Sequence, residues 1–85
     1  MMRDAREPRL VFYAEGEDAN QFLGLIVDAG EAAVIDRIVG GKLFDPDQEG
    51  TPRPRDEDDE TFAHDDGYTL VFNSRHERIW LYEPA

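Results

Sequence analysis

The apolar positions of the chain gather in short runs that alternate with polar connectors. The first run, residues 9–14 (RLVFYA), is rich in β-forming side chains and predicts a strand. Near the C-terminus, residues 68–72 (YTLVF) and 78–82 (RIWLY) flank the polar turn NSRHE and predict a β-hairpin.

The register of this C-terminal hairpin decides which side chains share a face. Because side chains alternate along a strand, pairing Phe72 with Arg78 places Leu70 and Phe72 beside Trp80 and Tyr82. One face of the hairpin then covers a core, and the other is a candidate contact surface.

A central apolar region fits two different structures. As a helix over residues 18–29, it has Asp18 as its N-cap and Gly30 just past its end. As a β-hairpin, residues 21–27 and 31–39 flank a three-residue turn that ends in Gly30. We expect the hairpin, because a helix exposes two large apolar side chains and carries a mid-helix glycine that costs about 1 kcal/mol.

Residues 20–36 (NQFLGLIVDAGEAAVID) resemble the early β-hairpin of the metallo-β-lactamase-fold hydrolases. The resemblance is a strand-turn-strand pattern, and the histidine-rich metal signature of that family is absent from the chain. It therefore implies a hairpin here and nothing about hydrolysis.

These patterns together predict a mainly β fold for one domain over residues 1–85. Strands joined by turns favour a small five-stranded antiparallel meander or a partly open barrel, since closure removes exposed sheet edges. The alternative is an α+β fold with one helix near residues 18–29 packed on a four-stranded antiparallel sheet. The five expected strands are residues 9–14, 21–27, 31–39, 68–72 and 78–82.

The charge of the chain is strongly uneven. The net charge is −11, and residues 45–66 hold ten acidic and two basic residues, a net charge of −8. Few apolar side chains and several Pro and Gly residues accompany these charges, so we expect a long, mobile, exposed loop. The five consecutive carboxylates of residues 56–60 repel one another and stay extended unless a cation or a basic surface matches them.

Such a charge disfavours direct binding to nucleic acid or to anionic membranes and favours a basic partner. We expect a non-enzymatic protein-binding domain, in sharper form an inhibitor or immunity-type protein. Like anti-restriction or anti-CRISPR proteins, it would mimic nucleic acid and occupy the basic site of a nucleic-acid-binding protein. The candidate partner-binding residues are Asp56, Glu57, Asp58, Asp59, Glu60, Asp65, Asp66, Trp80 and Tyr82.

Two other interpretations of the acidity stay open. Salt adaptation is compatible with the single lysine among nine basic residues. A weak Ca²⁺-binding module is suggested by residues 45–50 (DPDQEG), which match the first half of an EF-hand loop. The closing position is an aspartate where the motif needs a longer glutamate. The candidate Ca²⁺ ligands are Asp45, Asp47, Glu49 and Asp56.

The remaining reactive side chains predict no catalytic site and no other cofactor. The chain has no cysteine and two histidines, His64 and His76. A triad can be written from Ser74, His64 and Asp66, but a triad is recognised by geometry. The polar N-terminus lacks a signal-peptide core, and the apolar run of residues 22–27 is too short to span a bilayer, so we expect a cytoplasmic protein.

Overall fold

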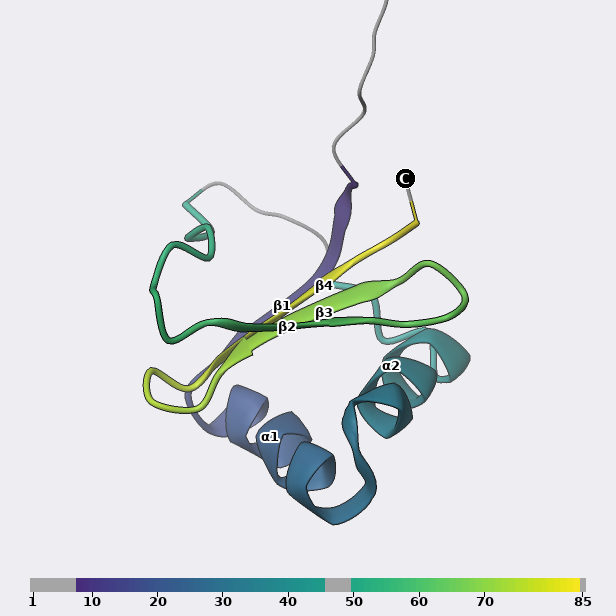
Figure 1. The fold of residues 1–85 in the computed structure, drawn as a ribbon, viewed down its shortest axis with the longest axis horizontal. Coiled ribbons are helices and arrows are strands. Elements are labelled where there is room, and N and C mark those ends of the chain that lie inside the picture. The colour runs from purple at the N-terminus through teal and green to yellow at the C-terminus, as the bar shows by residue number, and fades with distance from the viewer. Residues whose placement is uncertain (1–7, 46–49, 85) are drawn as a thin grey trace, which may run out of the picture.

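The computed structural model, which describes residues 8–45 and 50–84, has an α+β fold. A four-stranded antiparallel sheet carries two helices on one face (Figure 1). The mainly β prediction is therefore wrong, and its α+β alternative is the right class. Along the chain the elements are β1 (Leu10–Glu15), α1 (Glu17–Ala29), α2 (Glu31–Gly40), β2 (Glu60–Ala63), β3 (Thr69–Asn73) and β4 (Arg78–Tyr82), and the strand order in the sheet is β1-β4-β3-β2.

The central apolar region forms α1 and α2, so the expected hairpin, which the metallo-β-lactamase resemblance also implied, is wrong. Gly30 separates the helices with φ +99°, a conformation that side chains rarely adopt, and its N–H donates to the carbonyl of Ile26 at 2.8 Å. Val27 is 85% exposed in α1, and the exposure of such apolar side chains was one reason to expect a hairpin instead of a helix. A single exposed apolar side chain is common in folded proteins, and the burial of the other helix faces outweighs it.

The main core fills the space between the sheet and the two helices. Its helical side consists of residues three or four apart, as the period of a helix requires. Its sheet side consists of alternate residues of β3 and β4, together with Val11, Phe12 and Ala14 of β1, whose register shifts near its start. The fully buried members are Ala19, Val34, Ile35, Ile38, Leu70, Ile79 and Leu81.

The C-terminal hairpin has a register one residue away from the expected one. Phe72 pairs with Ile79, and Asn73 pairs with Arg78. The turn therefore holds four residues instead of five, and Glu77 adopts φ +54° to close it. Because one residue of slip turns every side chain to the other face, Trp80 lies opposite the helices.

A second, smaller core lies on this other face of the sheet. Leu10, Val71 and Trp80 are buried there, with Tyr13 and Tyr82 packed around them. The Trp80 indole N–H donates to the carbonyl of Pro52 at 2.9 Å, which ties the segment of residues 51–55 to the sheet. Figure 1 shows this segment on the side away from the helices.

The acidic stretch of residues 45–66 thus contains the strand β2 in addition to loop structure. Its expected mobility stays a prediction. Neither α1 nor α2 is long and apolar enough to cross a membrane, and the same holds for every helix in the described ranges.

Candidate functional site: an acidic edge of the sheet

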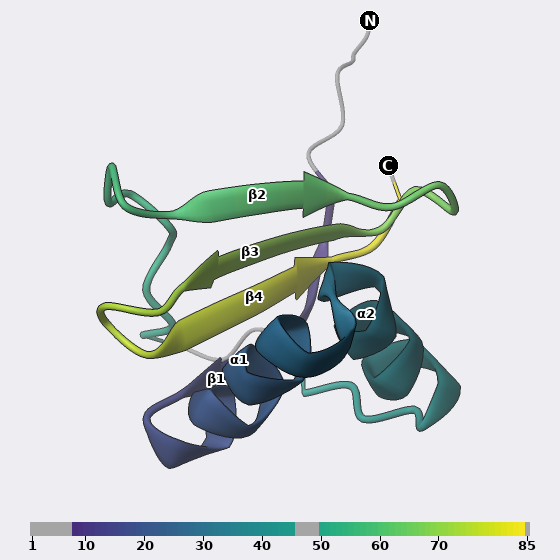
Figure 2. The same cartoon turned by 60° about the horizontal axis from the view of Figure 1, so that its bottom comes forward.

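Strand β2 lies at one edge of the sheet and carries acidic residues at both of its ends. Its partner is β3, with Glu60 opposite Phe72 and Ala63 opposite Thr69. The outer side of β2 meets no other strand of the described chain (Figure 2). The run Asp56–Glu60 leads into β2, and Asp65 and Asp66 follow it, so carboxylates bracket an open edge.

The backbone of β2 has a defined orientation at this edge. The N–H of His64 donates to the carbonyl of Tyr68 at 2.8 Å, next to the last pair of the ladder. Hydrogen-bonded and non-hydrogen-bonded pairs alternate in an antiparallel ladder. Because His64 is hydrogen-bonded, the backbone N–H and C=O groups of Phe62 and Glu60, two and four residues earlier, also point towards β3. The N–H and C=O groups of Thr61 and Ala63 consequently point outward, and both residues are exposed.

The acidic run that precedes β2 is folded into a turn. The N–H of Asp59 donates to the carbonyl of Asp56 at 3.0 Å, and the N–H of Asp58 donates to the Asp56 carboxylate at 2.9 Å. The N–H of Asp56 in turn donates to the Asp59 carboxylate at 2.8 Å. Backbone donors therefore compensate part of the negative charge, which an extended chain would not achieve.

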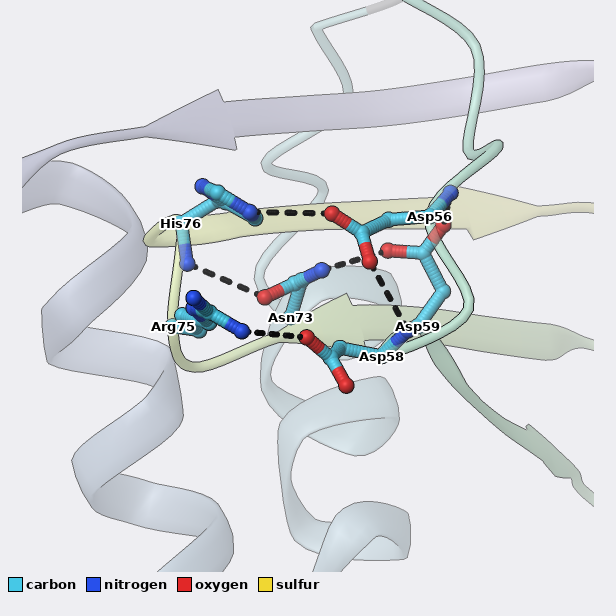
Figure 3. A network of polar contacts seen from close by, with 6 residues as sticks. All are labelled: Asp56, Asp58, Asp59, Asn73, Arg75 and His76. Atoms are coloured by element: carbon cyan, nitrogen blue, oxygen red, sulfur yellow. Dashed lines mark hydrogen bonds and ion pairs between the residues drawn. The ribbon is translucent and has the colours of Figure 1, made fainter.

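The β3–β4 turn supplies the second group of partners for this acidic turn (Figure 3). His76 Nε2 lies 2.9 Å from Asp56 Oδ2, and Arg75 Nη1 lies 3.1 Å from Asp58 Oδ2. Buried Asn73, only 1% exposed, donates from Nδ2 to Asp59 Oδ1 at 2.9 Å. The basic surface that the carboxylate run requires is thus partly provided by the chain itself.

These contacts change the acidity of Asp56. Its pKa is lowered from the ordinary 3.8, first because the backbone N–H of Asp58 donates to the carboxylate. The charge of His76 and its hydrogen bond lower the pKa further. The folded state therefore favours the ionised form of this side chain.

At the other end of β2, a tight turn orients Asp66. His64 Nδ1 lies 2.7 Å from Asp66 Oδ1, and the N–H of Tyr68 donates to the same oxygen at 3.2 Å. Gly67 occupies this turn with φ +98°. Asp65 is exposed beside it, so the two aspartates present their charge close to the exit of β2.

The other candidate residues lie apart from this acidic edge. Trp80 is 1% exposed beneath residues 51–55, and Tyr82 is half-buried on the same face of the sheet. Ser74 follows one end of β3, whereas His64 and Asp66 precede the other end, so the geometry does not assemble the triad that can be written from them.

Only part of the candidate calcium loop can be placed. Asp47 and Glu49 lie outside the described residues. The N–H of Asp45 donates to the carbonyl of Val11 at 2.9 Å, and both carboxylate oxygens of Asp56 have protein partners. Among the residues with a described position, no group of three metal-binding side chains is present. A Ca²⁺ site therefore stays a prediction.

Sequence reasoning missed the partners of the acidic turn. Asn73 ends β3, and Arg75 and His76 lie in the polar turn that follows it, a segment typical of a solvent-facing connector. Only the tertiary fold brings these side chains to the aspartates. The spacing of the sequence carries no signal for such a contact. Comparison of the chain with known protein families, with curated proteins and with solved structures finds no match.

Proposed function

We propose that the chain is a non-enzymatic protein-binding domain whose acidic edge holds a basic surface of a partner protein. The observation that carries the proposal is the bracketing of the open strand β2 by exposed carboxylates. The outward N–H and C=O groups of Thr61 and Ala63 add hydrogen-bonding capacity between the two acidic groups. This combination suits an extended basic segment better than a compact one.

Long-range electrostatics support the same proposal. Residues 56–66, which form the acidic turn, β2 and the turn that follows it, hold seven acidic residues and no Lys or Arg, a net charge of −7 within the −11 of the chain, so negative charge is concentrated around this edge. Such a field steers a basic partner towards the edge and accelerates its association. It also repels nucleic acid, so the partner is a protein that presents Lys and Arg.

The sharper form of the proposal is an inhibitor of a nucleic-acid-binding protein. Carboxylates spaced along a turn and a strand can take the place of phosphates against guanidinium and ammonium groups. The turn of Asp56–Asp59 is held in place by Asn73, Arg75 and His76, so it meets a partner with little loss of conformational freedom.

The test compares two variants that lose the same charge at different places. Recombinant protein is used as bait in extracts of its source cells at low and at high salt, and captured proteins are identified by mass spectrometry. The edge variant removes three exposed carboxylates around β2: Glu57→Gln, Glu60→Gln and Asp65→Asn. The control variant removes three exposed carboxylates from the helices: Asp18→Asn, Asp28→Asn and Asp36→Asn.

We expect the wild type and the control variant to retain the same basic partner at low salt. The edge variant is expected to lose this partner, and raised salt is expected to release it from the wild type. Equal capture by both variants would show that the position of the charge does not matter, which contradicts the proposal. Circular dichroism of both variants checks that the fold is retained.

A further inference from the structure

A groove of about 560 Å³ lies on the helix side of the open edge, between α1 and the start of β2. α1 packs mainly on β1 and β4, the two strands farthest from β2 (Figure 2). The helix side of β2 is therefore left largely uncovered. Phe62 is only half-buried there, and Glu60, which lies opposite Phe72 in the ladder, is exposed.

The walls of this groove are apolar. α1 contributes Leu23, Ile26 and Val27, and β3 contributes Phe72. Val27 is the most exposed large apolar side chain of the described residues, and Ile26 is half-buried. Both side chains therefore have free apolar surface, which a ligand with a hydrocarbon part can cover favourably.

Two carboxylates line the same groove. They belong to Glu31 at the start of α2 and Glu60 at the start of β2, and no Lys, Arg or His of the described chain lines it. Neither carboxylate forms an ion pair within residues 8–45 and 50–84. The groove thus combines an apolar surface with two negative charges that no described cation neutralises.

Lysine and arginine side chains have the complementary chemistry, because a hydrocarbon stem carries the cation at its end. We propose that the groove takes a Lys or Arg side chain of the partner protein, with the stem against Ile26 and Val27 and the cation at the carboxylates of Glu31 and Glu60. This inference rests on the proposed function of the acidic edge. It identifies the residue type that the edge selects and the place where that residue binds.

The open edge explains how such a side chain reaches the groove. A partner segment that pairs with the outward N–H and C=O groups of Thr61 and Ala63 adds a strand beside β2. Residues directly opposite each other in a ladder lie on the same face of the sheet. The partner residue opposite Glu60 therefore faces the helix side, and its side chain is directed towards the groove.

Two peptides of equal charge test the inference. One is an acetylated and amidated octapeptide in which lysine and threonine alternate. The other has diaminobutyrate in place of each lysine, which keeps the ammonium group on a stem shorter by two methylene groups. Binding of each peptide to the full chain is measured by NMR titration at mildly acidic pH, where both side chains are charged. We expect the lysine peptide to bind about tenfold more tightly, because the additional methylene groups are buried in the groove.

Variants of the chain separate the groove from the charge of the edge. Val27→Ser removes part of the apolar wall without a change of charge, and it should reduce the lysine preference to about threefold or less. Leu43→Ser, the matched control, removes an exposed apolar side chain outside the groove and should leave the preference unchanged. Glu57→Gln combined with Asp65→Asn removes edge charge outside the groove, so it should weaken both peptides by the same factor.

The possible outcomes distinguish the groove from the edge. Equal affinity of the two peptides, with binding that the Glu57→Gln, Asp65→Asn variant weakens, would overturn the inference and leave the proposed function standing. A lysine preference that Val27→Ser abolishes, with unchanged affinity in the charge variant, would support the groove and contradict the role of the edge.

Two further results would overturn the inference. One is the absence of saturable binding of the lysine peptide up to roughly 10 mM, which corresponds to very weak binding; the capture experiment above decides the proposed function separately. The other concerns a different occupant of the groove, a second copy of the chain. A dimer of the wild type that Val27→Ser dissociates in analytical ultracentrifugation would assign the groove to self-association.

Discussion

The side chain of Asn73 is expected to stabilise the fold out of proportion to its size. It is the buried polar side chain of the described residues, with 1% of its surface exposed. Its Nδ2 donates to Asp59 Oδ1 at 2.9 Å, and its Oδ1 accepts from the N–H of His76 at 3.0 Å. One side chain therefore closes the β3–β4 turn and ties the acidic turn to it.

The expected cost of Asn73→Ala follows from these two bonds. A neutral hydrogen bond contributes about 1 kcal/mol and a bond to a charged group about 2 kcal/mol. The free energy of unfolding should therefore fall by about 3 kcal/mol, a large part of the total for a small domain. For a chain of this size, the melting temperature should fall by about 15 °C.

Urea and thermal unfolding followed by circular dichroism measure these quantities, with Ser74→Ala as the neighbouring exposed control. Asn73→Asp adds a second comparison, because it keeps the acceptor for His76 and places an oxygen against Asp59 Oδ1. It should destabilise at least as much as alanine at neutral pH. A loss below about 0.5 kcal/mol for Asn73→Ala, the range of ordinary surface substitutions, would refute the reasoning.

Three further predictions concern the helix connection and two titrating side chains. Gly30→Ala should lower the free energy of unfolding by about 1–2 kcal/mol, because alanine is strained at the φ of +99° that Gly30 adopts, whereas Gly24→Ala should raise it by about 0.5–1 kcal/mol, because Gly24 lies in a helix with open space around it. Chemical unfolding of both variants measures these changes, and equal effects of the two substitutions would contradict the prediction. The pKa of Asp56 is lowered from 3.8, so the contribution of its carboxylate to stability is present above pH 3.8 and is lost as the pH falls further. NMR titration of the wild type, and acid unfolding of Asp56→Asn against the wild type, measure this; a pKa of Asp56 at or above 3.8 would contradict it. Burial first, and then the hydrogen bond to Glu15, raise the pKa of Tyr13 from 10.0 to about 12, so the contribution of this phenol to stability is complete below pH 10 and is lost as the pH rises through about 12. Ultraviolet absorbance titrations of the wild type and of Tyr13→Phe measure this: the variant should lack the tyrosine that titrates near 12. If the tyrosine missing from the variant titrates near 10 instead, the prediction is wrong.

The sequence predicted those parts of the fold that depend on local pattern. The strand over residues 9–14 appears as β1, and the runs 68–72 and 78–82 appear as the hairpin of β3 and β4. β-Forming residues between polar turns carry enough signal for such strands. The concentration of acid in residues 45–66 was also evident, because charge needs no structure to be counted.

Three features were decided by tertiary contacts. Residues 18–29 fit both a helical and an alternating pattern, and burial against the sheet selects the helix; residues 31–39, which were expected only as a strand, form a second helix that is buried against the same sheet. β2 was missed because its short segment ETFA lies inside an acidic run, and its pairing with β3 is what makes it a strand. The NSRHE turn allows two registers, and the packing of Ile79 and Leu81 under the helices selects one of them.

The candidate site also has one part that is evident from the sequence and another that depends on tertiary contacts. The sequence by itself determined which residues carry the negative charge. Only the tertiary structure placed these charges around an open strand, bound three aspartates to Asn73, Arg75 and His76, and brought Glu31 and Glu60 to one groove beside α1. The physical reason is that charge and hydropathy belong to single residues, whereas a site is made by contacts between residues far apart in the chain.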